Sequence, residues 1–296
     1  MIVNVEALIS SGERYISLVE SVPLYYLALA LLSYYLSVML YALRWKVILR
    51  GTGNDVELVR LFKIFMGSIF LNNVTPTSRS GGELLRIVWL SREKEVPLPI
   101  STASVVYERV LEAVPFMFLM LLGALRLLHD GVLIAVMMMG GVLLLWAKWD
   151  SLLRLFLRLM KSELDEHSIS QLEELKHSWR VTLAGIGLST AVWVLDVFRI
   201  KVVALAFGLN LPIGVVVLIS VANMLLGIAS ITPGGIGIME GGLIGVLIHL
   251  GIPAVFAVPV TLMERFVSYV QSTVVGMIVM FSSGGAEIWR ALKSRS

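Results

Sequence analysis

The sequence contains no cysteine and only four histidines, and these two shortages exclude several kinds of chemistry. Without cysteine there is no disulfide, no thiolate metal site and no thiol nucleophile. The histidines, at positions 129, 167, 177 and 249, show no spacing that is typical of a metal site. No hydrolytic triad is visible either. The sequence therefore predicts no metal, no cofactor and no enzymatic activity.

Charged residues are also scarce. They make up 15% of the chain, whereas hydrophobic residues make up 57% and the mean hydropathy is +0.87. A soluble domain carries about 25% charged residues. Several runs exceed about 20 mainly apolar residues, which is enough to cross a hydrocarbon core about 30 Å thick. The net charge of +3 is too small to indicate nucleic acid as a partner. The chain is therefore predicted to be an all-α polytopic protein of the cell membrane.

One pattern of residues occurs in each half of the chain. It consists of a Thr-Pro step, a glutamate seven residues after the proline, and a Glu-Arg pair 24 or 25 residues later. A basic triplet precedes each proline by 32 or 34 residues. The copies lie 155 to 157 residues apart in a chain of 296, so we predict a duplication of the whole chain. The first copy comprises Arg44, Lys46, Pro76, Gly81, Gly82, Glu83, Glu108 and Arg109, and the second comprises Arg199, Lys201, Pro233, Gly234, Gly235, Gly237, Glu240, Glu264 and Arg265.

The apolar runs predict membrane spans and two interrupted hairpins. Spans are expected at about 23–49, 99–125, 131–149, 180–207 and 253–281. Proline and glycine break the shorter apolar pieces at about 61–90 and 211–250. An arm of about ten residues rises only about 15 Å, which is too short to cross. We therefore predict re-entrant hairpins, whose irregular tips need protein or a wet cavity around them. The longer arms of the second hairpin would also suit full crossing, with no change in topology.

The basic residues predict the orientation of these segments. Lysine and arginine gather in the loops that would lie in the cytoplasm, with the N-terminus outside and the C-terminus inside. Residues 1–296 then form one membrane domain with an inverted duplication. Repeat 1 covers about 22–127, a connecting span 131–149, a cytoplasmic amphipathic linker 150–179, and repeat 2 about 180–283. Inverted repeats with broken helices are typical of secondary transporters, whose substrate site lies at the repeat interface.

The two Glu-Arg pairs fall near the middle of their predicted spans. Four unpaired charges at that depth would cost roughly 10 to 14 kcal/mol, so each needs a partner. Adjacent residues on a helix do not face each other, so the partner is not the neighbour. The symmetry favours reciprocal pairing of Glu108 with Arg265 and of Glu264 with Arg109. Glu83 and Glu240 are rival partners, and both a polar substrate path and a structural knot of salt bridges remain open.

Four basic residues lie nearer the ends of the first span of each copy. Two interpretations remain open for Arg44, Lys46, Arg199 and Lys201. Their charged ends either extend to the membrane surface or attract an anionic head group. Glu83 and Glu240 lie at glycine-rich breaks, where a role in transport is favoured.

These motifs resemble those of a known family. Four motifs look like the membrane region of lysylphosphatidylglycerol synthases, namely residues 73–86 (NVTPTSRSGGELLR), Val106-Tyr-Glu-Arg109, residues 231–240 (ITPGGIGIME) and Met263-Glu-Arg265. The wider group is the flippase-like integral membrane family. The resemblance implies a lipid translocator that stands alone, because no part of this chain looks like the soluble synthase domain. It also implies a substrate path through Asn73, Pro76, Gly81, Gly82, Glu83, Arg86, Glu108, Arg109, Pro233, Gly234, Gly235, Gly237, Glu240, Glu264 and Arg265. Arg86 has no counterpart in the second copy, where Leu243 takes its place.

Three functions follow as hypotheses. The first is a flippase for an anionic phospholipid, an aminoacyl lipid or a polyprenyl-phosphate-linked head group. The second is a membrane scaffold for a separate glycosyltransferase or lipid synthase as partner. The third is a small-solute or ion-coupled transporter that uses Glu83 and Glu240. The sequence indicates neither the lipid nor the oligomeric state.

Overall fold

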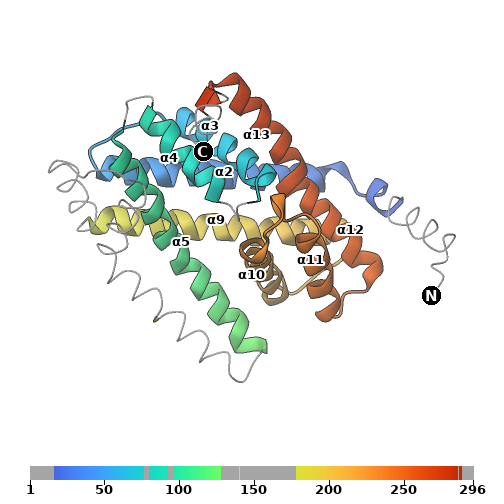
Figure 1. Ribbon diagram of the computed structural model, residues 1–296. Coiled ribbons are helices and arrows are strands. Elements are labelled where there is room, and N and C mark those ends of the chain that lie inside the picture. Colours follow the sequence, from blue (N-terminus) through green and yellow to red (C-terminus); the bar gives the residue numbers. More distant parts are fainter. Residues whose placement is uncertain are drawn as a thin grey trace.

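The computed structural model describes residues 17–76, 80–92, 96–127, 140, 178–285 and 287–288. Within these ranges every regular element is helical (Figure 1). Three helices are long and apolar enough to cross a membrane: Leu24–Gly51, Trp179–Ala206 and the continuous stretch Ala254–Ser282. This confirms the prediction of a helical protein whose helices are able to span a membrane. Nearly all of the predicted connecting span at 131–149 and of the linker at 150–179 lies outside the described residues.

The first half contains a long helix, two shorter helices and a second long helix. These are α2 (Leu24–Gly51), α3 (Leu58–Val74), α4 (Ser80–Arg92) and α5 (Leu98–Leu127). Proline sets several of the boundaries, because it lacks the amide donor that a helix interior needs. Pro23 precedes α2, Pro97 precedes α5, and α3 ends two residues before Pro76.

The second half repeats this order. It contains α9 (Trp179–Ala206), α10 (Ile213–Ala229), a short 3₁₀ turn η1 (Pro233–Gly235) and α11 (Ile238–His249). A long helix follows, made of α12 (Ala254–Arg265), the π-helical turn η2 (Phe266–Val270) and α13 (Gln271–Ser282). Pro212 and Pro253 stand directly before α10 and α12. The helix bounds therefore agree with the predicted segments to within a few residues.

Each half packs one of its helices against the other half. Helices α2 and α9 lie side by side through the middle of the molecule (Figure 1). Helix α3 packs against α13 of the other half, and α10 packs in the same way against α5. One apolar core combines α2–α5 with Met280 and Ile288, and another combines α9–α12 with Ala30.

Small residues allow the closest of these contacts. A Cβ atom on Gly276 of α13 would lie 2.5 Å from the Met66 carbonyl oxygen of α3. Gly67 of α3 similarly faces Trp89 of α4 and Met280 of α13. Because no side chain fits there, α13 is fixed against α3 and α4.

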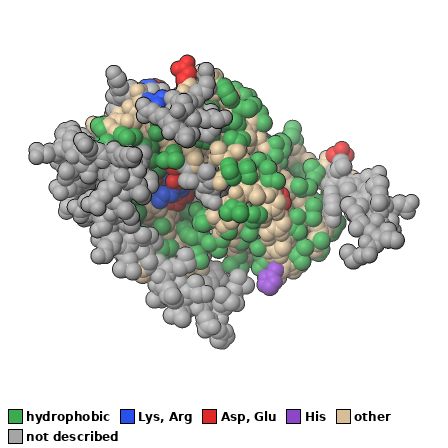
Figure 2. Space-filling view, viewed as in Figure 1, with side chains coloured by type: hydrophobic (Ala, Val, Ile, Leu, Met, Phe, Trp, Pro, Cys, Tyr) green, Lys and Arg blue, Asp and Glu red, His purple; other side chains and the backbone are tan. Residues whose placement is uncertain are grey.

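The outer surface is mostly apolar. Figure 2 shows hydrophobic side chains over most of the described part of the face in view, with few charged ones among them. Leu24, Ile213 and Phe281 are among the exposed large side chains, at 76%, 65% and 62% exposure. Such a surface suits a hydrocarbon environment, because a soluble protein rarely exposes large contiguous apolar patches.

Candidate functional site

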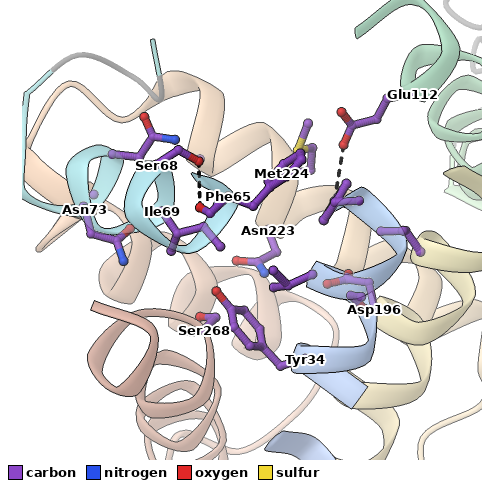
Figure 3. A pocket seen from close by; sticks show the side chains of 18 of the residues that line it. Tyr34, Phe65, Ser68, Ile69, Asn73, Glu112, Asp196, Asn223, Met224 and Ser268 are labelled. Carbon is purple, nitrogen blue, oxygen red and sulfur yellow. Dashed lines mark hydrogen bonds between the residues drawn. The ribbon is translucent and has the colours of Figure 1, made fainter. Parts of the chain in front are cut away.

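A polar cavity of about 280 Å³ lies between the two halves. It is lined by α2–α5 from the first half and by α9–α12 with the tip of the second hairpin from the second half. Figure 3 shows Tyr34, Asn73, Glu112, Asp196 and Asn223 around it. Five arginines reach its wall, namely Arg44, Arg86, Arg109, Arg199 and Arg265. Of the four charges that the sequence placed deep in the spans, Arg109 and Arg265 line this cavity, whereas Glu108 and Glu264 lie behind its wall.

In the first half, Glu108 is the centre of a buried cluster of charges. It is 1% exposed and pairs with Arg44 at 3.3 Å and with Arg86. Arg86 lies over the rings of Trp45 and Phe65, with its guanidinium carbon 4.2 Å and 3.7 Å from their centroids. This cation–π contact helps to hold a charge that water does not reach.

The neighbouring Arg109 points toward the hairpin. It pairs with Glu83 at 2.5 Å and with Glu112 at 2.7 Å. Glu112 also lies 3.6 Å from Arg44, so it connects this pair with the buried cluster around Glu108. Helix α5 thus places Glu108 between Arg44 of α2 and Arg86 of α4, and it places Arg109 beside Glu83 at the start of α4.

The second half repeats this arrangement. Arg199 binds both carboxylate oxygens of Glu264, at 3.2 Å and 2.8 Å, and it also binds Asp196 at 2.6 Å. Arg265 binds Glu240 at 2.6 Å and donates to the Gly234 carbonyl oxygen at 2.7 Å. Each Glu-Arg pair is therefore satisfied by the first long helix and the hairpin of its own half.

The predicted reciprocal pairing of Glu108 with Arg265 and of Glu264 with Arg109 is wrong. The rival partners, Glu83 and Glu240, hold the two arginines instead. The physical reason is packing. Helix α5 lies against α2 and α4, and α12 lies against α9 and α11, so an opposite charge is available inside each half.

The basic residues of the first long helices divide into two kinds. Arg44 and Arg199 are buried, at 1% and 5% exposure, so neither extends to the membrane surface. Lys46 lies 3.4 Å from Asp55, and Lys201 bonds Asn210 at 2.7 Å. Only the arginines reach the cavity wall, and the lysines are tied to residues at the helix ends.

The second hairpin owes its tip to glycine. Gly234, Gly235 and Gly237 have φ angles of 59°, 72° and 84°, which side-chain-bearing residues rarely adopt. Pro233 starts the 3₁₀ turn, and Glu240 accepts a hydrogen bond from the Gly237 amide at 2.6 Å. Glu240 therefore caps α11 and holds Arg265 at the same time.

In the first hairpin, made of α3 and α4, the two helices approach each other closely. The Gly82 amide donates to Asn72 at 2.7 Å, and a Cβ on Gly82 would lie 2.3 Å from the Ser68 carbonyl oxygen. Asn73 donates to Ser272 and Thr273 of α13, at 3.3 Å and 2.7 Å. Pro76 is exposed beside residues 77–79, which lie outside the described part, and Gly81 lies in the first turn of α4, directly after Ser80.

Several residues at the site were not among those predicted from the sequence. Glu112, Asp196, Ser220, Asn223 and Tyr41 all line the cavity. Two of them could have been found by helix spacing. Glu112 lies one turn after Glu108, and Asp196 lies three residues before Arg199, so each shares a helix face with a residue of the repeated pattern.

Comparison with known families agrees with this architecture. Residues 7–276 match the family model of the lysylphosphatidylglycerol synthase TM region. The chain belongs to this family. Similar curated members are described as UPF0104 membrane proteins. One from Pyrococcus horikoshii is 25% identical over 305 residues, covering 92% of this chain and 91% of the relative. One from Methanocaldococcus jannaschii is 28% identical over 294 residues, covering 89% and 86%. No solved structure matches the chain significantly.

Proposed function

We propose that this protein moves a lipid-linked anionic head group across the membrane. The observation that carries the proposal is the cavity itself, in which five arginines of both halves meet beside a broken helix. Arginine binds phosphate and carboxylate groups well because its guanidinium offers several donors in a planar fork. A head group that takes the place of the carboxylates bound to these arginines would stay paired with a positive charge while it crosses the membrane.

The proposal includes an inverted repeat with two hairpins. In each half the same order of helices occurs, and α3 packs on α13 as α10 packs on α5. This reciprocity is what a two-fold axis in the membrane plane would produce. The hairpin tips would then approach the cavity from opposite sides. The N-terminus would lie outside and the C-terminus in the cytoplasm of a cell-membrane protein.

The cargo is proposed to keep its acyl or polyprenyl chains in the bilayer. The cavity is too small for a whole lipid, because about 280 Å³ is near the lower end of the volumes of small-molecule sites. A head group fits this space better than a complete lipid. The membership in the synthase membrane-region family supports a lipid cargo, and an activity that does not include lipid synthesis.

The direct test is a head-group accessibility assay in liposomes. Purified protein is reconstituted with fluorescent phosphatidylglycerol, an aminoacyl phosphatidylglycerol or a polyprenyl phosphate. An impermeant quencher then reports how fast inner-leaflet label reaches the outside. We expect faster exposure of at least one of these lipids with the wild-type protein than with liposomes that lack it. If none of the three lipids is exposed faster than in liposomes without the protein, the lipid translocator is rejected and a scaffold for a separate synthase or glycosyltransferase is favoured.

The topology has its own test. The chain has no native cysteine, so single cysteines introduced at Gly12, Asp130, Glu166 and Ser294 can be labelled one at a time. We expect an impermeant thiol reagent to reach positions 12 and 130 from outside, and positions 166 and 294 only after the membrane is opened. Labelling of Gly12→Cys and Ser294→Cys from the same side would contradict the inverted repeat.

A further inference from the structure

The paired charges of the two halves do not balance equally. In the first half three arginines face three carboxylates, and in the second half two arginines face three. The first set is Arg44, Arg86 and Arg109 with Glu83, Glu108 and Glu112, and the second is Arg199 and Arg265 with Asp196, Glu240 and Glu264. Among the described residues of this network, the second half therefore has one carboxylate in excess.

The excess is located at Arg199. This single guanidinium holds Glu264 at 2.8 Å and Asp196 at 2.6 Å. The side chain of Glu264 is 3% exposed, whereas that of Asp196 is 22% exposed and lines the cavity. Arg265 does not relieve the excess, because it is already bound by Glu240 and the Gly234 carbonyl. One positive charge is shared by two carboxylates, and one of them opens to the cavity.

The groups packed around this pair add no free positive charge. From α2, Arg44 donates to Ser189 but is paired with Glu108 and Glu112. The remaining titratable or charged neighbours are Tyr34 and Tyr41 of α2, Glu112 and Arg109 of α5, and Arg265 of α12. Helix α10 contributes only neutral groups to this side. Both carboxylates depend on the one guanidinium of Arg199, and charge that is removed from water without full compensation is unfavourable, so the pair favours an additional cation.

The neutral groups of α10 point to where that cation sits. Ser220 donates a hydrogen bond to Asp196, and Asn223 follows one turn later on the same helix. The side-chain oxygen of Asn223 is buried and accepts no hydrogen bond from any described residue. Figure 3 shows Asn223 and Asp196 on the same cavity. An unused acceptor and a surplus carboxylate on one cavity leave room for a proton donor or a small cation.

We infer that Asp196 and Glu264 together bind one monovalent cation, either a proton or Na⁺, at the cavity wall. Two carboxylates that share one site do not both remain charged, and the proton belongs to the pair rather than to one residue. Intramembrane carboxylates of transporters commonly form proton relays. The cation would enter from the cavity through Asp196, and its exchange would drive the movement of the head group. The coupling rests on the proposed function, whereas the binding of the cation does not.

Infrared difference spectroscopy of the purified protein tests the binding without any transport. In Na⁺-free buffer at neutral pH we expect the carbonyl band of a protonated carboxyl group. Because the excess is a single charge, Asp196→Asn and Glu264→Gln should each abolish this band. The matched control is Asp55→Asn, which removes an exposed carboxylate in the loop after α2 and should leave the band unchanged. Both site variants are isosteric, and if one fails to fold the other still decides the result.

Sodium distinguishes the two cations. If the site takes Na⁺, added NaCl should remove the band in the wild-type protein, whereas KCl of equal ionic strength should not. If it takes only protons, neither salt should change the band. The inference is overturned if no protonated band appears from mildly acidic to mildly alkaline pH, or if the band survives both site variants. A cationic lipid that supplies the charge would give the first of these results.

The liposome assay then separates the site from its use. With the band present, we expect head-group movement to respond to an imposed pH or Na⁺ gradient and to lose that response in Asp196→Asn. Movement that ignores both gradients would overturn the coupling and leave the site intact. No movement of any lipid would reject the proposed function instead.

Discussion

Glu108 and Glu264 occupy matching positions, yet two arginines hold Glu108 and only one holds Glu264. The second arginine of the first half is Arg86, and Leu243 occupies its place in the second half. Leu243 packs in the apolar core of that half. One half has therefore kept a charge where the other has a hydrophobic contact.

The third carboxylate of each half differs as well. In the first half Glu112 follows Glu108 by one turn and is shared by Arg44 and Arg109. In the second half Ser268 occupies the matching position, and the third carboxylate is Asp196, which matches Tyr41. The Glu-Arg pairs are common to both halves. The residues around them balance the charges in the first half, whereas the second half needs one further cation.

The largest expected difference is in stability. Glu108→Leu would leave Arg44 and Arg86 without their main partner, and loss of one member of a buried pair costs about 3–5 kcal/mol. Glu264→Leu should cost less, about 1.5–3 kcal/mol for lost charge-assisted hydrogen bonds, because Arg199 keeps Asp196. Thermal unfolding in detergent would rank the two variants. Equal losses would mean that the halves do not differ in the way proposed.

The hairpins should differ next. Gly82→Ala would place a methyl group against the Ser68 carbonyl, and overpacking of this kind costs about 1–3 kcal/mol. Gly245→Ala in α11 is the matched control, since nothing lies near its Cβ position and alanine favours a helix by about 1 kcal/mol. Unfolding midpoints should therefore move in opposite directions. A shift in the same direction would show that the close contact at Gly82 is not a constraint.

A smaller difference is expected between the hairpin glutamates. Glu83 is held by Arg109, whereas Glu240 holds Arg265 and also caps the Gly237 amide. Glu83→Gln and Glu240→Gln should both slow head-group movement, and Glu240→Gln should lose about 1 kcal/mol more stability through the weakened cap. Transport rate and unfolding are measured on the same preparations. A Glu83→Gln protein that fails to fold would assign this carboxylate to the structure alone.

The smallest effect belongs to a charge outside the cavity. The hydrogen bond from Arg50 holds the pKa of Asp55 below its usual value. A lowered pKa in the folded state contributes stability above the unfolded value of about 4, and this contribution is lost as the pH falls through the folded value. The stability of the Asp55→Asn protein against unfolding should therefore be slightly below that of the wild type at neutral pH and equal to it in strong acid. A difference that persists in acid would contradict the ion-pair origin.

The positions of the described helices were largely predictable from the sequence, because proline, glycine and apolar run length act locally. Pro23, Pro212 and Pro253 stand where the predicted spans and hairpin arms begin. The partners of the charges were not predictable in this way. Glu108 and Arg44 are 64 residues apart, and only the packing of α2 against α5 brings them together. A symmetry argument favoured pairs across the repeats, whereas neighbouring helices inside each repeat already supplied opposite charges.

The packing of α13 on α3 and of α10 on α5 also determines the order in which the chain can assemble during synthesis. The core around Trp89 and Gly67 is completed by Met280 and Gly276 of α13, which emerge from the ribosome long after Gly67 and Trp89. Until then the first hairpin lacks the wall against which it packs, although its own residues were made about 200 residues earlier. Nascent chains that end before α13 should therefore stay open to membrane chaperones and proteases. The two halves, similar in pattern, mature together and not one after the other.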